Sequence, residues 1–181
     1  MFSISIEPSP LLQSMINRVA LIPNGLEKAG RRAVQRTLRG GKQDAARKVA
    51  QRYTIKTGKV TSTIRTSQSG LSGVMSSKGA RNMLKEFILR PRTRPRKMPA
   101  GGVYVQNVRG QGGNLLHAFL QKGGGVFERE GRSRYPIRHL TGPSAPQMLG
   151  NPIVGPHIES KMFQRLQINL DHELNAVLGG F

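Results

Sequence analysis

Alternating apolar and polar residues at the start of the chain predict a short strand. Residues 2–6 read FSISI, in which apolar residues alternate with serine, as in a strand with one buried face. Prolines end this pattern, and apolar residues at helical spacing over 11–19 predict a helix behind Pro10. We therefore expect a strand and helix segment at residues 1–25, and it is a candidate for a separate interaction arm.

A long helix is predicted from Leu26, because small and apolar residues recur every three or four positions as far as Tyr53. Two glycines, Gly40 and Gly41, fall inside this pattern. Glycine costs about 1 kcal/mol relative to alanine inside a helix. We therefore expect the helix to be kinked or interrupted at this pair.

Short apolar runs between glycine-rich turns predict strands in the second half of the chain. The strand candidates are residues 83–90, 102–108, 125–130 and 134–140, whereas 114–121 fits either a helix or a strand. A short helix is expected at residues 58–66, and a proline-rich connector at 141–152. The chain then ends in an amphipathic helix behind Pro156, in which apolar residues repeat from Ile158 to Val177.

These elements together indicate the α+β class. Helices lie towards both ends of the chain, and the strands between them predict a small, mainly antiparallel sheet with glycine-rich turns. A length of 181 residues fits a single domain over 1–181, with an extended arm at about residues 90–102.

The charge balance is strongly positive. Twenty-nine Lys and Arg residues face nine Asp and Glu residues, which gives a net charge of +20. A monomer with this excess repels itself, so a polyanion or an acidic neighbouring protein is the expected partner. The chain has no cysteine, which excludes disulfides and thiolate metal sites. No apolar run approaches the ~20 residues of a membrane span, so we expect no membrane partner.

Part of this charge lies on one face of the long helix. From Lys28 to Arg52 this face carries nine basic residues, and Asp44 is the one acid in the interval. An exposed helix normally mixes both signs, because i,i+4 ion pairs stabilise it. One-sided charge suggests that the counter-ions come from outside the helix, although a solvated face fits equally well. The contact candidates on this face are Arg31, Arg32, Arg36 and Arg39.

A second basic segment follows, which reads RPRTRPRKMPAGG over residues 90–102. Prolines that alternate with arginines exclude a helix and favour an extended, polyproline-like arm. Such an arm can follow a phosphate backbone, and arginine binds phosphate with two parallel hydrogen bonds. Few aromatic residues accompany the arm, so we expect it to contact charge rather than bases. An acidic protein neighbour fits nearly as well. Its five cations are Arg90, Arg92, Arg94, Arg96 and Lys97.

No motif predicts an active site, a metal site or a cofactor. The glycines at 110–113 lack the third spaced glycine of a dinucleotide fingerprint, and Gly41-Lys42 lacks the rest of a P-loop. The four histidines have no metal-ligand spacing. Glu128 and Glu130 share one face of a predicted strand, but arginines surround them, so ion pairing explains them better than catalysis. We therefore expect no enzyme.

Residues 118–149 carry a recognisable pattern. It consists of Ala118-Phe119, a strand that ends in acid and arginine at 126–129, Arg-Tyr-Pro-Ile at 134–137, and Gly-Pro-Ser-x-Pro-Gln-Met at 142–148. This pattern resembles the minor tail protein Z family of lambda-like tailed phages and prophages, the tail-completion proteins. The basic, alanine-rich helix upstream also agrees, so the resemblance extends from about residue 26 to the last helix.

The resemblance implies a non-enzymatic virion protein that acts late in tail assembly, at the head-proximal end of the tail. It implies a homo-oligomer, with a sixfold ring as the expectation, made in the bacterial host cytoplasm. The implied partners are tail-terminator, tail-tube or neck and connector proteins, and phage DNA through nonspecific phosphate contacts. The alternative is a stand-alone, sequence-nonspecific nucleic-acid-binding protein.

The resemblance also implies roles for single residues. We expect Tyr135 and Pro136 to form a packed strand–turn anchor, and Arg134 and Arg138 beside them to face a neighbour or DNA. The remaining structural positions of the motif are Phe119, Gly142 and Pro143.

Overall fold

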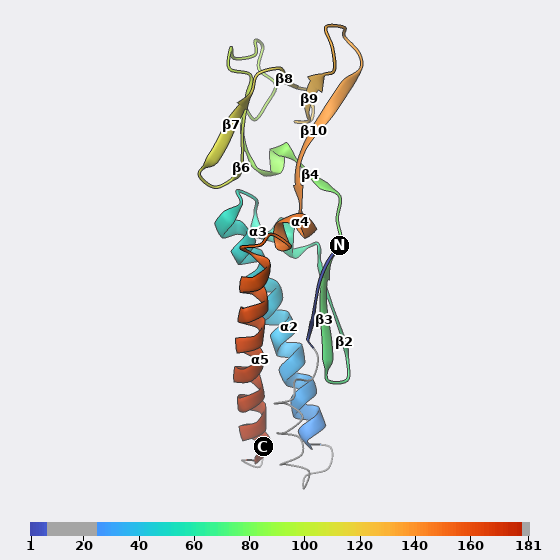
Figure 1. Ribbon diagram of the computed structural model, residues 1–181, viewed down its shortest axis with the longest axis vertical. Helices are drawn as coiled ribbons and strands as arrows, with labels where there is room; N and C mark the ends of the chain where they lie inside the picture. The colour runs from blue at the N-terminus through green and yellow to red at the C-terminus, as the bar shows by residue number, and fades with distance from the viewer. Residues whose placement is uncertain (7–24, 179–181) are drawn as a thin grey trace.

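The computed structural model describes residues 1–6 and 25–178, and Figure 1 shows an elongated molecule with a helical end and a β-rich end. The helix expected at residues 11–19 lies outside the described residues. Helices, strands and antiparallel sheets are all present, which confirms the α+β class. Within the described residues, none of the helices combines the length and apolar character that crossing a membrane requires.

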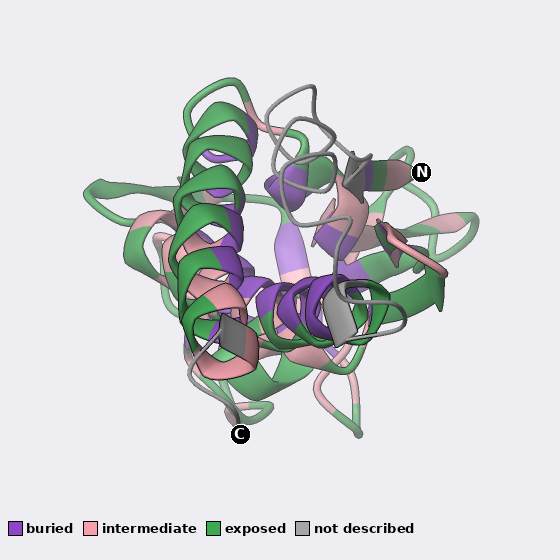
Figure 2. Cartoon of the chain, turned by 90° about the horizontal axis from the view of Figure 1, so that it is seen from below, coloured by how far each residue is buried: buried purple, intermediate pink, exposed green. Residues whose placement is uncertain are grey.

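Two long helices, α2 (Gly25–Arg52) and α5 (Gly155–Leu178), form the helical end. They run antiparallel and side by side along the long axis of the molecule (Figure 1). Buried residues lie on their inner sides, and exposed residues cover the outer sides (Figure 2). The predicted apolar repeat of the last helix is confirmed as core by Ile158, Met162, Leu166 and Leu170, which are all at most 5% exposed.

The predicted interruption at Gly40 and Gly41 is wrong, because α2 is helical through both. A Cβ atom at Gly41 would lie 2.9 Å from Met162 Cγ, and one at Gly40 would lie 2.8 Å from Arg165 Nη1. The glycines therefore let α5 approach α2 closely. Tertiary packing outweighs the poor helix propensity of glycine here.

A three-stranded antiparallel sheet packs beside α2 in the order β1-β3-β2. Its strands are β1 (Phe2–Ile6), β2 (Ile64–Ser69) and β3 (Ser72–Ser77). The predicted first strand is confirmed, and it pairs with β3 along its whole length, so residues 2–6 belong to the sheet and do not form an arm. The short helix expected at 58–66 is α3 (Thr57–Thr61), and the chain continues from it into β2.

The β-rich end contains two further antiparallel sheets, in the orders β4-β10-β9-β8 and β5-β6-β7. The first consists of β4 (Arg81–Met83), β8 (Ala118–Leu120), β9 (Val126–Arg129) and β10 (Ile137–Ser144). The second consists of β5 (Ile88–Arg90), β6 (Val103–Val108) and β7 (Gln111–Leu115). Residues 114–121 thus contribute to two strands and form no helix.

The single strand expected at 83–90 is wrong, because a 3-10 turn, η1 (Leu84–Glu86), separates β4 from β5. Leu84 and Phe87 are both buried, and they belong to different hydrophobic clusters. Leu84 joins the cluster of the β-rich end, whereas Phe87 joins the main cluster between the helices and the first sheet.

The connector expected at 141–152 is also more regular than predicted. Strand β10 continues to Ser144, where the helix α4 (Ala145–Leu149) begins. Ser144 and Gln147 form a reciprocal capping box, in which the Ser144 N–H donates to Gln147 Oε1 at 2.9 Å.

Candidate nucleic-acid interface

The basic residues singled out from the sequence lie in two separate parts of the molecule. Arg31, Arg32, Arg36 and Arg39 are exposed on α2, in the half towards the helical end (Figure 1). Arg90 ends β5, and Arg92, Arg94, Arg96 and Lys97 follow it in the loop to β6, at the opposite end of the long axis (Figure 1). The structure therefore does not bring the two sets together.

Two neighbouring hollows lie between α2 and β2, with volumes of about 300 and 380 Å³. Gln35 and Gln68 line both of them, so we treat the two as one α2/β2 groove. Gln68 is held in place because its Nε2 donates to Arg31 O at 2.8 Å. None of the lining residues described is acidic. The cations and hydroxyls of the groove are Lys28, Arg31, Arg32, Arg39, Lys42, Thr66 and Ser67.

Part of the positive charge on α2 is neutralised within the chain. Arg36 Nη1 lies 2.8 Å from Glu173 Oε1, and Arg32 Nη1 lies 4.0 Å from Glu173 Oε2. The Glu173 side chain, on α5, is only 5% exposed. A buried carboxylate needs a cation beside it, so Arg36 ties the two helices together and is not a lining residue of the groove. Glu173 was not predicted from the sequence, although it lies three residues after Leu170 on the buried side of α5.

Asp44, like Glu173, binds basic side chains of its own chain. Arg165 of α5 donates from Nε to Asp44 Oδ2, and Arg47 Nη1 lies 3.9 Å from Asp44 Oδ1. The hydrogen bond to Asp44 raises the pKa of Arg165 above its ordinary value, partial burial opposes the rise, and the charge of Asp44 adds to it. Arg165 therefore stays protonated. Both acids bind cations at the α2–α5 contact. Among the groove cations, Arg32 contacts Glu173, and Arg31 Nε lies 3.5 Å from Glu27 Oε1, whereas Lys28, Arg39 and Lys42 have no carboxylate partner among the described residues.

The segment at 91–102 is a loop without regular secondary structure. It packs against its own chain and is not the extended arm that was predicted. Met98 packs against the hydrophobic cluster of the β-rich end, and the Gly102 N–H donates to Pro99 O at 2.9 Å. Gly102 has φ +71°, and a Cβ atom there would lie 2.1 Å from Leu115 O, so glycine is required. The four cations of the loop are nevertheless all exposed.

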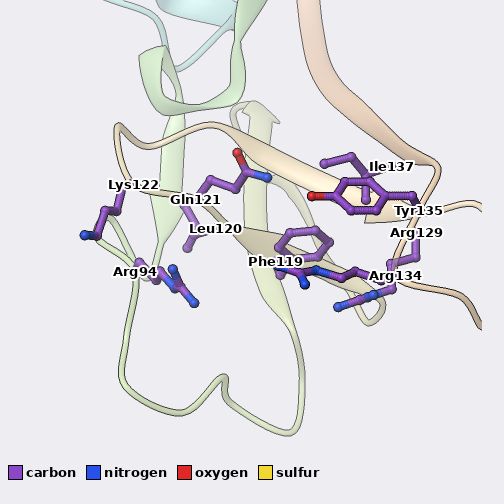
Figure 3. Close-up of a pocket in the computed structure, with 9 residues that line it drawn as sticks. All are labelled: Arg94, Phe119, Leu120, Gln121, Lys122, Arg129, Arg134, Tyr135 and Ile137. Carbon is purple, nitrogen blue, oxygen red and sulfur yellow. The ribbon is translucent and has the colours of Figure 1, made fainter.

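One of these cations, Arg94, lines a pocket of about 410 Å³ in the β-rich end (Figure 3). Three more cations join it from separate places in the chain: Lys122 before β9, Arg129 at the end of β9, and Arg134 between β9 and β10. We call this site the β-end pocket. No acidic residue is among those described that line it. The other lining residues are Phe119, Leu120, Gln121, Tyr135 and Ile137.

Aromatic rings lie beside two of these cations, Arg129 and Arg134 (Figure 3). Arg129 Cζ lies 5.6 Å from the ring centroid of Phe119, and Arg134 Cζ lies 5.7 Å from that of Tyr135. Phe119 is half-buried and lies next to Phe127, with 6.3 Å between ring centroids. The expectation that Tyr135 is a packed anchor is wrong, because 64% of it is exposed. The sequence placed no aromatic residue near the basic segment, whereas the fold places two in the pocket that Arg94 also lines.

The other motif residues contact their own chain. Gly142 is buried, and a Cβ atom there would lie 2.5 Å from Phe87 Cε2. Pro143 O accepts a hydrogen bond from Asn82 Nδ2 at 2.7 Å, and Pro136 O accepts one from the Glu130 N–H at 3.2 Å. These positions join β10 to its neighbours.

Ion pairing was expected for Glu128 and Glu130, and it is confirmed for Glu128. Arg138 Nη2 lies 2.8 Å from Glu128 Oε2, across the β9–β10 pair in which these two residues are directly opposite. Arg138 therefore has a carboxylate partner within the chain, while Arg134 faces the β-end pocket.

Comparison with known proteins adds no relative. No protein-family model, no curated protein and no solved structure matches this chain.

Proposed function

We propose that this chain is a structural virion protein of a tailed bacteriophage or prophage. It acts in tail completion and head–tail joining at the head-proximal end of the tail, with its basic surface close to the DNA path. The observation that carries the proposal is the placement of residues 118–149, on which the family resemblance rests. They form one continuous unit of β8, β9, β10 and α4, in which each strand pairs antiparallel with the next.

Within this unit, the motif residues have packing and hydrogen-bonding roles. Gly142 leaves room for the Phe87 ring, and Ser144 and Gln147 cap α4. The Gly-Pro-Ser-x-Pro-Gln-Met stretch therefore joins the β-rich end to the helical core, where Met148 is fully buried. A motif that joins two parts of the fold in this way is consistent with a structural protein of an assembly.

The charge distribution supports a place near DNA. The elements that line the α2/β2 groove and those that line the β-end pocket lie towards opposite ends of an elongated molecule (Figure 1). The lining residues described at both sites are basic, polar or apolar. DNA or acidic neighbouring subunits would supply the missing anions. In a ring of copies, with six as the expected number, a basic surface on each copy would face the channel. Tail-terminator, tail-tube and neck proteins are the proposed protein partners.

Deleting the gene from the phage or prophage tests this proposal. We expect lysates that contain filled heads and separate tails, with infectivity restored when a plasmid supplies the intact gene. Joined, infectious particles made in the absence of the gene would refute it.

A stand-alone, sequence-nonspecific nucleic-acid-binding protein is the second candidate, and the α2/β2 groove favours it. Its cations and hydroxyls suit phosphate oxygens in any sequence. This function requires the isolated chain to bind duplex DNA or RNA tightly at low salt, with an affinity that falls steeply as salt rises. It also requires particle assembly to proceed normally without the gene, which separates it from the first proposal.

A further inference from the structure

We propose that the β-end pocket binds an unpaired nucleotide of single-stranded DNA. Its cations hold the phosphates, and the rings of Tyr135 and Phe119 stack on the base. The proposal deepens the function proposed above and rests on the nearness of the chain to DNA, because it names the form of DNA that this end of the molecule contacts.

The size and shape of the pocket suit one such group. At about 410 Å³, it falls within the ~300–1,000 Å³ range of ligand sites in proteins. Residues from the 91–102 loop, from the segment between β8 and β9, and from both sides of the β9–β10 turn converge on it (Figure 3). A flat basic surface would be enough for duplex phosphates, whereas this site is hollowed.

The phosphate-binding groups are already arranged. Arg129 and Arg134 lie 5.6 and 5.7 Å from the aromatic rings beside them. Arg129 Nη1 donates a hydrogen bond to Ser133 O at 3.4 Å, and its other N–H groups and those of Arg134 can donate to phosphate oxygens. Lys122 and Arg94 add two further cations from other parts of the chain. Two acids flank Arg129 in the sequence: Glu128 binds Arg138, and Glu130 is not among the residues that line the pocket.

The aromatic rings distinguish a single strand from a duplex. In a duplex the bases are stacked on one another, whereas a single strand can place a base on a protein ring. Tyr135 is 64% exposed, and the cost of leaving a large ring in water is offset if a base covers it. An acidic protein segment would use the four cations, but it would gain little from an exposed ring. The combination therefore favours a nucleotide over an acidic peptide.

Binding of a short oligothymidylate to the full chain, followed by fluorescence anisotropy, tests the proposal. Replacing Tyr135 (Tyr135→Ala) should weaken binding about 5- to 150-fold, the effect of losing one base–aromatic stack. The double variant Arg129→Gln/Arg134→Gln should lower the slope of log K against log salt by about 1.4, at about 0.7 for each lost contact. The matched control is Phe163→Ala, because Phe163 is 51% exposed on α5 and distant from the pocket; it should bind as the parent does.

Tyrosine emission provides a second readout. The chain has no tryptophan and three tyrosines. Tyr53 is buried and Tyr104 half-buried, so Tyr135 is the exposed one. Oligothymidylate should quench the emission of the parent, and Tyr135→Ala should abolish that quenching. Thermal unfolding of each variant shows whether the fold is retained. Because Tyr135 is exposed, we expect Tyr135→Ala to retain it.

Three results would overturn the proposal. The first is equal affinity for oligothymidylate and for an abasic strand of the same length. The second is an unchanged affinity in Tyr135→Ala. The third is tighter binding of polyglutamate than of the oligonucleotide, which would assign the pocket to an acidic protein. Each of these can occur while deletion of the gene still separates heads from tails, so the pocket can fail without the proposed function failing.

Discussion

The α2/β2 groove yields a quantitative prediction for duplex DNA. We consider the triple variant Lys28→Gln/Arg39→Gln/Lys42→Gln, which neutralises groove cations for which no carboxylate partner is seen among the described residues. It leaves untouched Arg32 and Arg36, which contact the buried Glu173. All three side chains are exposed or half-buried, so the fold should tolerate glutamine at these positions.

The magnitude follows from counterion release. Each phosphate contact on duplex DNA contributes about 0.9 to the slope of log K against log salt, so losing three contacts should lower the slope by about 2.7. For the same fourfold rise in salt concentration, the affinity of the parent should therefore fall about 40-fold more than that of the variant. Fluorescence anisotropy of a labelled duplex, titrated at several salt concentrations, measures both slopes.

A control variant separates the position of the charge from its amount. Lys56→Gln/Lys78→Gln/Lys161→Gln also lowers the net charge from +20 to +17, since three cations are lost, but none of the three lines the groove. Its slope should remain close to that of the parent. Equal slopes in the two variants would show that net charge alone sets the binding and would refute the groove as the duplex site.

Three further predictions concern the fold. Gly41→Val should lower the free energy of unfolding by about 1–3 kcal/mol, because its side chain meets Met162 at a contact where Cβ alone would lie 2.9 Å from Cγ. Gly58→Ala, in open space on α3, should instead raise it by up to about 1 kcal/mol, and urea denaturation measures both. Ser144→Ala removes the hydroxyl that accepts the Gln147 N–H in the capping box and should cost about 1 kcal/mol in the same assay; an unchanged midpoint would mean that α4 does not need this cap.

The helices show what could be predicted from the sequence alone. The repeat of Ile158, Met162, Leu166 and Leu170 identifies the buried side of α5, because the periodicity of a helix maps directly onto its faces. The continuity of α2 could not be predicted in the same way. Whether Gly40 and Gly41 interrupt a helix depends on the partner that packs against them, and that partner lies more than a hundred residues further along the chain.

The candidate site shows a similar division. Arg94 and Arg134 were singled out from the sequence, whereas Lys122 and Arg129 were not. The convergence of these cations could not be predicted, because the β8-β9-β10 pairing brings Lys122, Arg129 and Arg134 to one pocket. The glycine-rich turn at 123–125 is the signal that could have suggested this hairpin. The exposure of Tyr135 was missed for the same reason: the sequence pattern does not reveal which side of the β9–β10 turn lacks a covering element.

The location of the chain in the particle tests the central claim most directly. Purified virions of the phage or induced prophage would be labelled with gold-coupled antibody against this chain and imaged by electron microscopy. We predict label at the junction of head and tail, with none on the separate heads and tails of the deletion strain. Virions that lack the chain, while the same lysate contains it in abundance, would contradict the account.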